Sequence, residues 1–183
     1  MGRSADRCSP CGQPEKPGGR KASGDILVFL DADVRLSETF LEDFLERIEQ
    51  RNLDIACPLY MPYRSTLLIK VIHSFINVVF VALQKVIPSG AGHCIAVKRE
   101  VFQHSPGFDP TLKLGEDVAL VRKLSKGHRF GIVAKHLFVS DRRYKEEGVF
   151  RMLTKILLLS IIFTFNKFDW ANRIEHAFGN HTL

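Results

Sequence analysis

Two aspartates with one residue between them follow an apolar stretch early in the sequence. The stretch is Ile26 to Leu30 (ILVFL), and Asp31 and Asp33 come directly after it. Two carboxylates crowded beside apolar residues repel each other unless a cation neutralises them. A hard divalent ion such as Mg²⁺ or Mn²⁺ binds one or two carboxylates and takes further ligands from substrate phosphates. The pair therefore predicts a divalent metal site at Asp31 and Asp33, with a turn of helix-capping acids as the alternative.

A second acidic pair, Glu116 and Asp117, begins a segment whose apolar residues recur at helical spacing. The helix dipole stabilises ionised carboxylates in a first turn. An ionised carboxylate that faces a substrate hydroxyl can accept its proton as a general base. Two acids in a first turn are also common in helices without a catalytic role, so both interpretations stay open on the local pattern.

Arg142 and Arg143 form a third candidate group, because guanidinium groups match the geometry of phosphate. A solvated basic turn is the alternative. Between Arg122 and Lys155 the sequence has ten Lys and Arg against three Asp and Glu, so this region is expected to attract anions. It has no basic run interleaved with aromatic residues, as single-strand binders have, which favours a small phosphate compound or a lipid headgroup over nucleic acid.

The elements that must position these residues indicate an α/β domain. Ile26–Leu30 is typical of a strand buried on both faces in a parallel sheet, and open α/β sheets bind ligands at the carboxyl ends of such strands. Ser37 is expected to cap a helix that carries Phe40, Leu41, Phe44, Leu45 and Ile48 on one face. The other predicted strands are Asp54–Leu59 (ended by Pro58), His93–Lys98 and Phe130–Val139, and the other predicted helices are Glu116–Lys126 and Val149–Asn166.

The segment Leu67–Ile87 is apolar almost all round, with a narrow polar stripe of Lys70, His73, Ser74, Asn77 and Gln84. The stripe argues against a simple transmembrane span and leaves two options, a buried core helix or a helix in a membrane interface. Ile156–Phe165 is too short to cross a bilayer. The basic residues around it, Arg151, Lys155 and Lys167, suit an anionic membrane surface.

The composition fits one folded domain, since 45% of the 183 residues are hydrophobic and 25% are charged. Residues 1–23 are rich in Gly, Pro, Ser, Arg and Lys and are expected to form a disordered lead-in. Cys8 and Cys11 have the spacing of half a zinc knuckle but lack a second pair. Four cysteines are too few for a disulfide framework, and no signal peptide is visible, so we expect a cytoplasmic protein, with peripheral contact to the cytoplasmic face of a membrane as an option.

Taken in order, the motifs resemble family 2 glycosyltransferases with the GT-A fold, from about Ala22 to Arg151. The first is ASGDILVFLDADV, which resembles the family's segment of A-x-G-D, an apolar strand and D-x-D. The second is GAGHCIAVKREVFQHSPGFDPTLKLGEDVALVRKLSKGHRFGIV, which resembles its acceptor-side block. The third is SDRRYKEEGVFR, which is similar to the S-x-R-R segment of a small bacterial and archaeal branch.

The resemblance implies a partial GT-A domain at residues 24–148, with a mixed central sheet and flanking helices, followed by an amphipathic helical segment at 149–183. It also implies transfer of a sugar from a nucleotide diphosphate donor to an acceptor hydroxyl, with inversion and with an acceptor that is often lipid-linked. The implied roles are a metal ligand (Asp33), a ribose or metal contact (Asp31), a general base (Asp117, with Glu116 beside it), and contacts to the donor (Gly92, Arg142 and Arg143).

The sequence also departs from the family, because only 23 residues precede Gly24, where family members place two or three strand-helix units. We therefore expect the pocket for the nucleotide base to be missing. This leaves a truncated GT-A module that binds a membrane or a partner without catalysis as an alternative. A haloacid dehalogenase-like phosphatase is a further alternative, although Val34 and Arg35 stand where that family has Gly or Ser and then Thr. The Q-x-x-R-W motif of processive synthases is absent.

Overall fold

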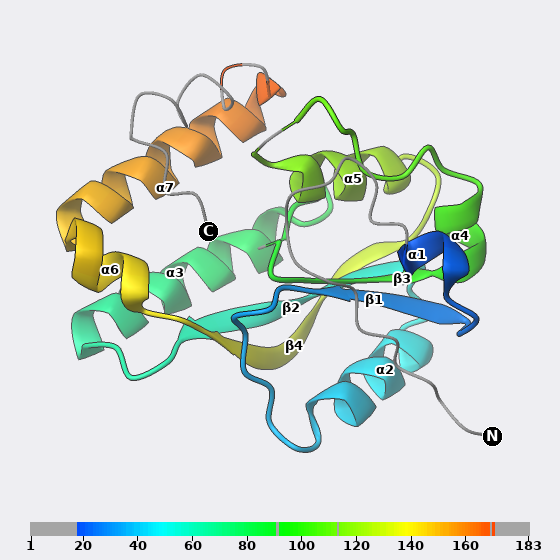
Figure 1. Cartoon of the computed structure of the whole chain (residues 1–183), viewed down its shortest axis with the longest axis horizontal. Coiled ribbons are helices and arrows are strands. Elements are labelled where there is room, and N and C mark those ends of the chain that lie inside the picture. The colour runs from blue at the N-terminus through cyan, green and yellow to red at the C-terminus, as the bar shows by residue number, and fades with distance from the viewer. Residues whose placement is uncertain (1–17, 91, 113, 169, 171–183) are drawn as a thin grey trace.

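The computed structural model describes residues 18–90, 92–112, 114–168 and 170 (Figure 1). Four strands form a mixed sheet in the order β1-β3-β2-β4, in which β3 is antiparallel to β1 and β2, and β2 is parallel to β4. The strands are β1 (Ile26–Leu30), β2 (Ile55–Pro62), β3 (Cys94–Lys98) and β4 (Phe130–Val139). The helices are α1 (Gly18–Lys21), α2 (Phe40–Gln50), α3 (Leu67–Leu83), α4 (Arg99–Gln103), α5 (Glu116–Leu124), α6 (Arg142–Glu147) and α7 (Val149–Thr164). The expected class, an α/β domain with a mixed sheet, is confirmed.

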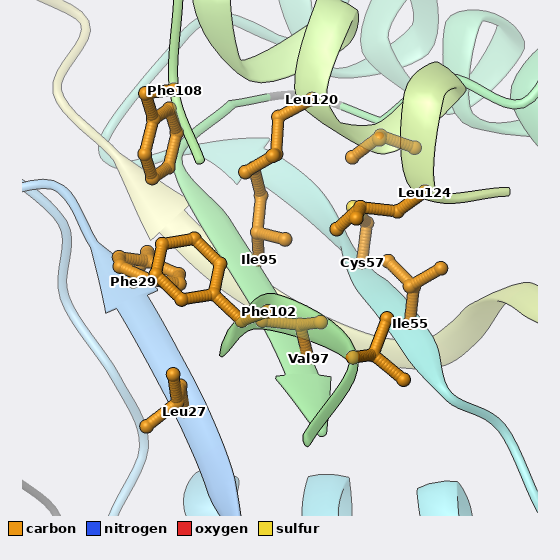
Figure 2. Packing of buried hydrophobic residues seen from close by; sticks show 12 residues of the cluster. Leu27, Phe29, Ile55, Cys57, Ile95, Val97, Phe102, Phe108, Leu120 and Leu124 are labelled. Atoms are coloured by element: carbon orange, nitrogen blue, oxygen red, sulfur yellow. The ribbon is translucent and has the colours of Figure 1, made fainter. Parts of the chain in front are cut away.

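Each face of the sheet has its own hydrophobic core. In the view of Figure 1, α5 lies above the sheet and α2 below it. The upper core joins strand residues to α4 and α5, and in it the ring of Phe29 contacts Phe102 and Phe108 at centroid distances of 5.0 and 5.1 Å (Figure 2). The lower core is built on α2, whose Phe40 and Phe44 are fully buried. Two covered faces fix the plane of the sheet and thereby the positions of its strand ends.

Three local expectations are wrong in detail. The strand β1 is fully buried on one face only, because Leu27 and Phe29 are buried while the residues of its other face are partly buried against the lower core. Its neighbour β3 is antiparallel rather than parallel. The N-cap of α2 is Thr39 rather than Ser37. The strand β2 continues through Pro58, where its pairing with β4 shifts register, and a bulge of this kind tolerates the missing N–H of proline.

Ordered structure begins before Gly24. The helix α1 starts at Gly18, Gly19 is buried, and Ala22 packs against the upper core. Cys8, Cys11 and most of the expected lead-in lie outside the described residues. Among the described residues, no helix has the length and apolarity needed to cross a membrane.

Thr66 starts α3, since its hydroxyl accepts a hydrogen bond from the backbone N–H of Ile69 at 3.4 Å. We expect Thr66→Ala to lower the free energy of unfolding by about 1 kcal/mol, because an orphan N–H of the first turn loses its partner. Urea denaturation followed by circular dichroism measures the change. Thr66→Ser keeps the hydroxyl and serves as the control. An equal loss in both variants would contradict the role of the hydroxyl.

Candidate functional site

Asp31 lies at the carboxyl end of β1, where the beginning of β3 holds it. Leu30 pairs with Cys94, so His93 is the residue opposite Asp31. The backbone N–H of Asp31 donates to the carbonyl of His93 at 3.1 Å, and Nδ1 of His93 lies 3.1 Å from Oδ2 of Asp31. The first acid of the pair is therefore partly buried beside an imidazole, at the strand end where the sequence placed it.

Asp33 lies two residues further on, in the turn after β1, and is exposed. The two carboxylates are thus in different surroundings, one against His93 and one toward solvent. Among the described residues there is no group of three or more His, Cys, Asp and Glu side chains placed to hold a metal ion. Two carboxylates in a turn fit a hard cation that takes its other ligands from substrate phosphates, so the residues present fit a divalent metal of that kind.

Asp117 lies in the first turn of α5, with its carboxylate directly against the backbone of Gly92. A Cβ placed on Gly92 would be 1.3 Å from Oδ2 of Asp117, so only glycine leaves room for the carboxylate there. Oδ1 of Asp117 accepts a hydrogen bond from the N–H of Val118 at 2.8 Å. The site therefore joins the loop before β3 to the start of α5.

Burial raises the pKa of Asp117, and the charge of Asp31 raises it further, while the N–H of Val118 and the imidazole of His93 oppose the rise. Asp31 and His93 are therefore close enough to Asp117 for their charges to affect its pKa. A carboxylate whose pKa is raised is a stronger base than an ordinary surface carboxylate. The predicted residues Asp31, Gly92 and Asp117 thus come together in one place.

Glu116 precedes Asp117 in the same helical turn and is partly buried. The turn begins at Gly115, whose φ of 81° is in the left-handed region. A Cβ on Gly115 would lie 2.5 Å from the ring of Phe163 in α7. The acidic pair is therefore presented at a point where α5 and α7 meet closely.

Arg142 and Arg143 open the helix α6 rather than forming a turn. The exposed guanidinium of Arg142 lies 3.7 Å from Glu146, one turn further along the helix. The structure thus places Arg142 on the surface of α6 and shows no contact between it and Asp31 or Asp117. The side chain of Arg143 lies outside the described part of the chain.

A group of buried aromatic and polar side chains connects α6 to the site, and we did not predict it from the sequence. Nε2 of His73 in α3 lies 2.6 Å from the hydroxyl of Tyr144 in α6. The ring of Tyr60 in β2 contacts His73 at a centroid distance of 5.0 Å and His93 at 5.4 Å. Asn77 donates to the carbonyl of Tyr60 at 2.8 Å. The spacing of His73 and Asn77, four residues apart on an apolar helix, is the signal in the sequence that points to this group.

Burial lowers the pKa of His73 to about 4, with a smaller contribution from His93, and raises the pKa of Tyr144 to about 12. Both groups are therefore neutral at pH 7. Nδ1 of His73 is buried and has no hydrogen-bond partner among the described residues.

Part of the chain matches a known protein family. Residues 18–105 match the family described as glycosyl transferase family 2. This stretch, slightly less than half of the chain, is therefore similar to glycosyl transferase family 2. The family 2 segment contains Asp31, Asp33, Gly92 and His93, whereas Glu116, Asp117 and the two arginines lie beyond its end. No curated protein matches the chain.

Solved structures show the same fold at low sequence identity. One is a mannosyltransferase from Pyrobaculum calidifontis, in complex with GDP-Man and Mn²⁺ (TM-score 0.55, 20% identity), which covers 70% of this chain and is itself covered over 36% of its length. Another is residues 1–349 of TarS from S. aureus (TM-score 0.50, 16% identity), with 82% of this chain and 45% of that chain covered. The chain thus spans less than half the length of these proteins and has a partial GT-A fold.

Proposed function

We propose that this chain, alone or as part of a larger protein, transfers a sugar from a nucleotide diphosphate donor to an acceptor hydroxyl. The observation that carries the proposal is the meeting of Asp31, His93 and Gly92, which lie within the stretch similar to family 2, with Asp117 at the carboxyl end of β1. A partly buried carboxylate that lies near a second carboxylate and an imidazole can act as a general base toward a hydroxyl.

Asp117 accepts the proton of the acceptor hydroxyl. The acceptor oxygen forms its bond to the anomeric carbon on the face opposite the leaving diphosphate, and the bond from that carbon to the phosphate oxygen breaks with its electron pair on the diphosphate. A single displacement of this kind inverts the anomeric configuration. Gly92 leaves room for the carboxylate of Asp117, and His93 keeps Asp31 in place.

Asp33 and Asp31 would hold a divalent cation. When bound, such a cation neutralises negative charge on the diphosphate. The mannosyltransferase structure with GDP-Man and Mn²⁺ supports this assignment. Arg142 and Arg143 in α6 are proposed as further partners of the donor phosphates. The lipid-linked acceptor and the location at the cytoplasmic face of a membrane are parts of the same proposal.

Donor binding tests the proposal directly. Calorimetry of the chain with a panel of nucleotide sugars is expected to show binding that depends on Mn²⁺. Asp33→Ala is expected to weaken this binding about tenfold or more, because a metal ligand is lost. The matched control is Glu42→Ala, an exposed acid of α2 on the far side of the sheet. Binding that persists unchanged in a chelator would contradict the metal assignment, and no binding by any donor would contradict the function.

A further inference from the structure

The helix α3 exposes large apolar residues, while two of its polar residues face the protein. His73 and Asn77 are buried, at 3% and 5% exposure. Leu67, Val71, Phe75 and Val78, at helical spacings of four, four and three, are between 57% and 77% exposed. The option of a buried core helix is therefore wrong for this face of α3.

The helix α7 shows the same pattern. Phe150 is 85% exposed, Leu157 64%, and Ile161 48%, and their spacings of seven and four put them on one face. Phe165 and Trp170, which follow the helix, are 70% and 60% exposed. A soluble surface rarely exposes so many large apolar residues close together.

Near both ends of α3, contacts through neighbouring segments link it to α7. Near the start, His73 of α3 is hydrogen-bonded to Tyr144 of α6, and α6 leads into α7 through Gly148. Near the end, Arg122 donates to the carbonyl of Pro88, just after α3, and to the carbonyl of Phe163 in α7. In the view of Figure 1 the two helices run in the same direction. We call their exposed apolar residues the α3–α7 surface: Leu67, Val71, Phe75, Val78, Phe150, Leu157, Ile161, Phe165 and Trp170.

Most of the charged residues around the α3–α7 surface are basic. Residues 55–99 and 148–168 contain no Asp or Glu. Lys70 and Lys85 are exposed next to α3 residues of the surface, and Arg151 and Lys167 are exposed at the two ends of α7. Lys155, which the sequence grouped with them, is instead paired with Glu147. Large apolar and aromatic side chains bordered mainly by cations complement a bilayer that contains anionic lipids.

We propose that the α3–α7 surface binds the surface of an anionic lipid bilayer, with the two helices lying in the interface. The surface is joined to the candidate site through Tyr60, whose ring contacts both His73 and His93. If the proposed sugar transfer holds, this orientation brings a lipid-linked acceptor to the side of the molecule where Asp117 lies. The lipid contact itself does not depend on that activity.

Trp170 is the only tryptophan of the chain and so reports on this surface. We expect its fluorescence to shift to shorter wavelength, and the protein to float, with vesicles of phosphatidylcholine that contain about 30% phosphatidylglycerol, and much less with phosphatidylcholine alone. Raising the salt to about 1 M is expected to weaken binding, because screening removes the charge attraction.

Two sets of variants locate the contact. Phe75→Ser and Leu157→Ser are each expected to weaken vesicle binding about tenfold through lost apolar contact. Leu36→Ser, an exposed leucine outside the α3–α7 surface, is the matched control. Lys70→Gln and Lys85→Gln are each expected to weaken binding about fivefold, and Arg47→Gln, on α2, is their control.

Several outcomes would overturn the proposal. One is a wild-type chain that binds neither kind of vesicle, and another is loss of binding in Leu36→Ser equal to that in Phe75→Ser. A third is a wild-type chain that forms a dimer in analytical ultracentrifugation, does not bind vesicles, and becomes a monomer in Phe75→Ser. That result would assign the surface to a second copy of the chain. Vesicle binding is measured without donor, so its failure is distinct from failure of the donor calorimetry.

Discussion

Asp117→Asn is expected to lower the rate of sugar transfer about a thousandfold, because the amide cannot accept the proton of the acceptor hydroxyl. The change is nearly isosteric, so the amide still fits against Gly92, and the N–H of Val118 keeps an oxygen partner. Donor affinity is expected to stay near the wild-type value, since Asp117 acts on the acceptor. Single-turnover transfer from the donor identified by calorimetry, together with its dissociation constant, separates the two effects.

The matched control is Asp109→Asn, an exposed acid in the turn before α5 that bonds only locally, to Thr111. It is expected to leave transfer within about twofold of wild type. Equal losses in Asp109→Asn and Asp117→Asn would remove Asp117 from the role of base. Loss of donor affinity in Asp117→Asn would place this residue at the donor instead.

The second large effect concerns stability in acid. The folded protein holds His73 with a pKa of about 4, and an unfolded histidine has a pKa near 6.5. The unfolded chain therefore binds more protons as the pH falls, and stability drops. From about pH 7.5 to about pH 5, His73 alone is expected to remove about 2 kcal/mol of unfolding free energy. The groups that face His73 are Tyr144 from α6, Tyr60 from β2 and His93 from the loop before β3.

Urea denaturation at the two pH values measures this loss. His73→Gln removes the titrating group and is expected to flatten the dependence, while His128→Gln, at an exposed histidine, keeps it. The histidine signals in NMR give a second measurement that does not depend on how well His73→Gln folds. A folded wild-type protein whose His73 protonates near pH 6.5 would contradict the prediction.

The elements near the site were largely predictable, because their patterns are local. The apolar residues of β1 and β4 predicted where these strands begin and end. The helical spacing of apolar residues in α2 predicted which face of the helix is buried. The end of β2 was predicted too early because a proline was expected to stop the strand. The strand continues because its register against β4 shifts at Pro58. This shift depends on the pairing of two distant strands, so the local sequence does not predict it.

The contacts within the site were not predictable in the same way. The sequence placed Asp31 and Asp117 at the ends of elements, but their approach depends on β3 entering antiparallel to β1 and on the space above Gly92. No metal-ligand spacing in the sequence singles out His93. The inward polar face of α3 was also missed, since polar residues of an apolar helix are usually assigned to solvent. Here the carbonyl of Tyr60 and the hydroxyl of Tyr144 supply partners inside the protein.

The close contact between Gly115 and Phe163 couples the position of α7 to the start of α5. The backbone that starts α5 lies against an aromatic ring of α7, only two residues before Asp117. A shift of the C-terminal helix along its axis would press on that backbone or release it, and the position of the carboxylate would change with it. With the proposed sugar transfer and the proposed lipid contact together, we expect transfer to be faster on anionic vesicles than in solution.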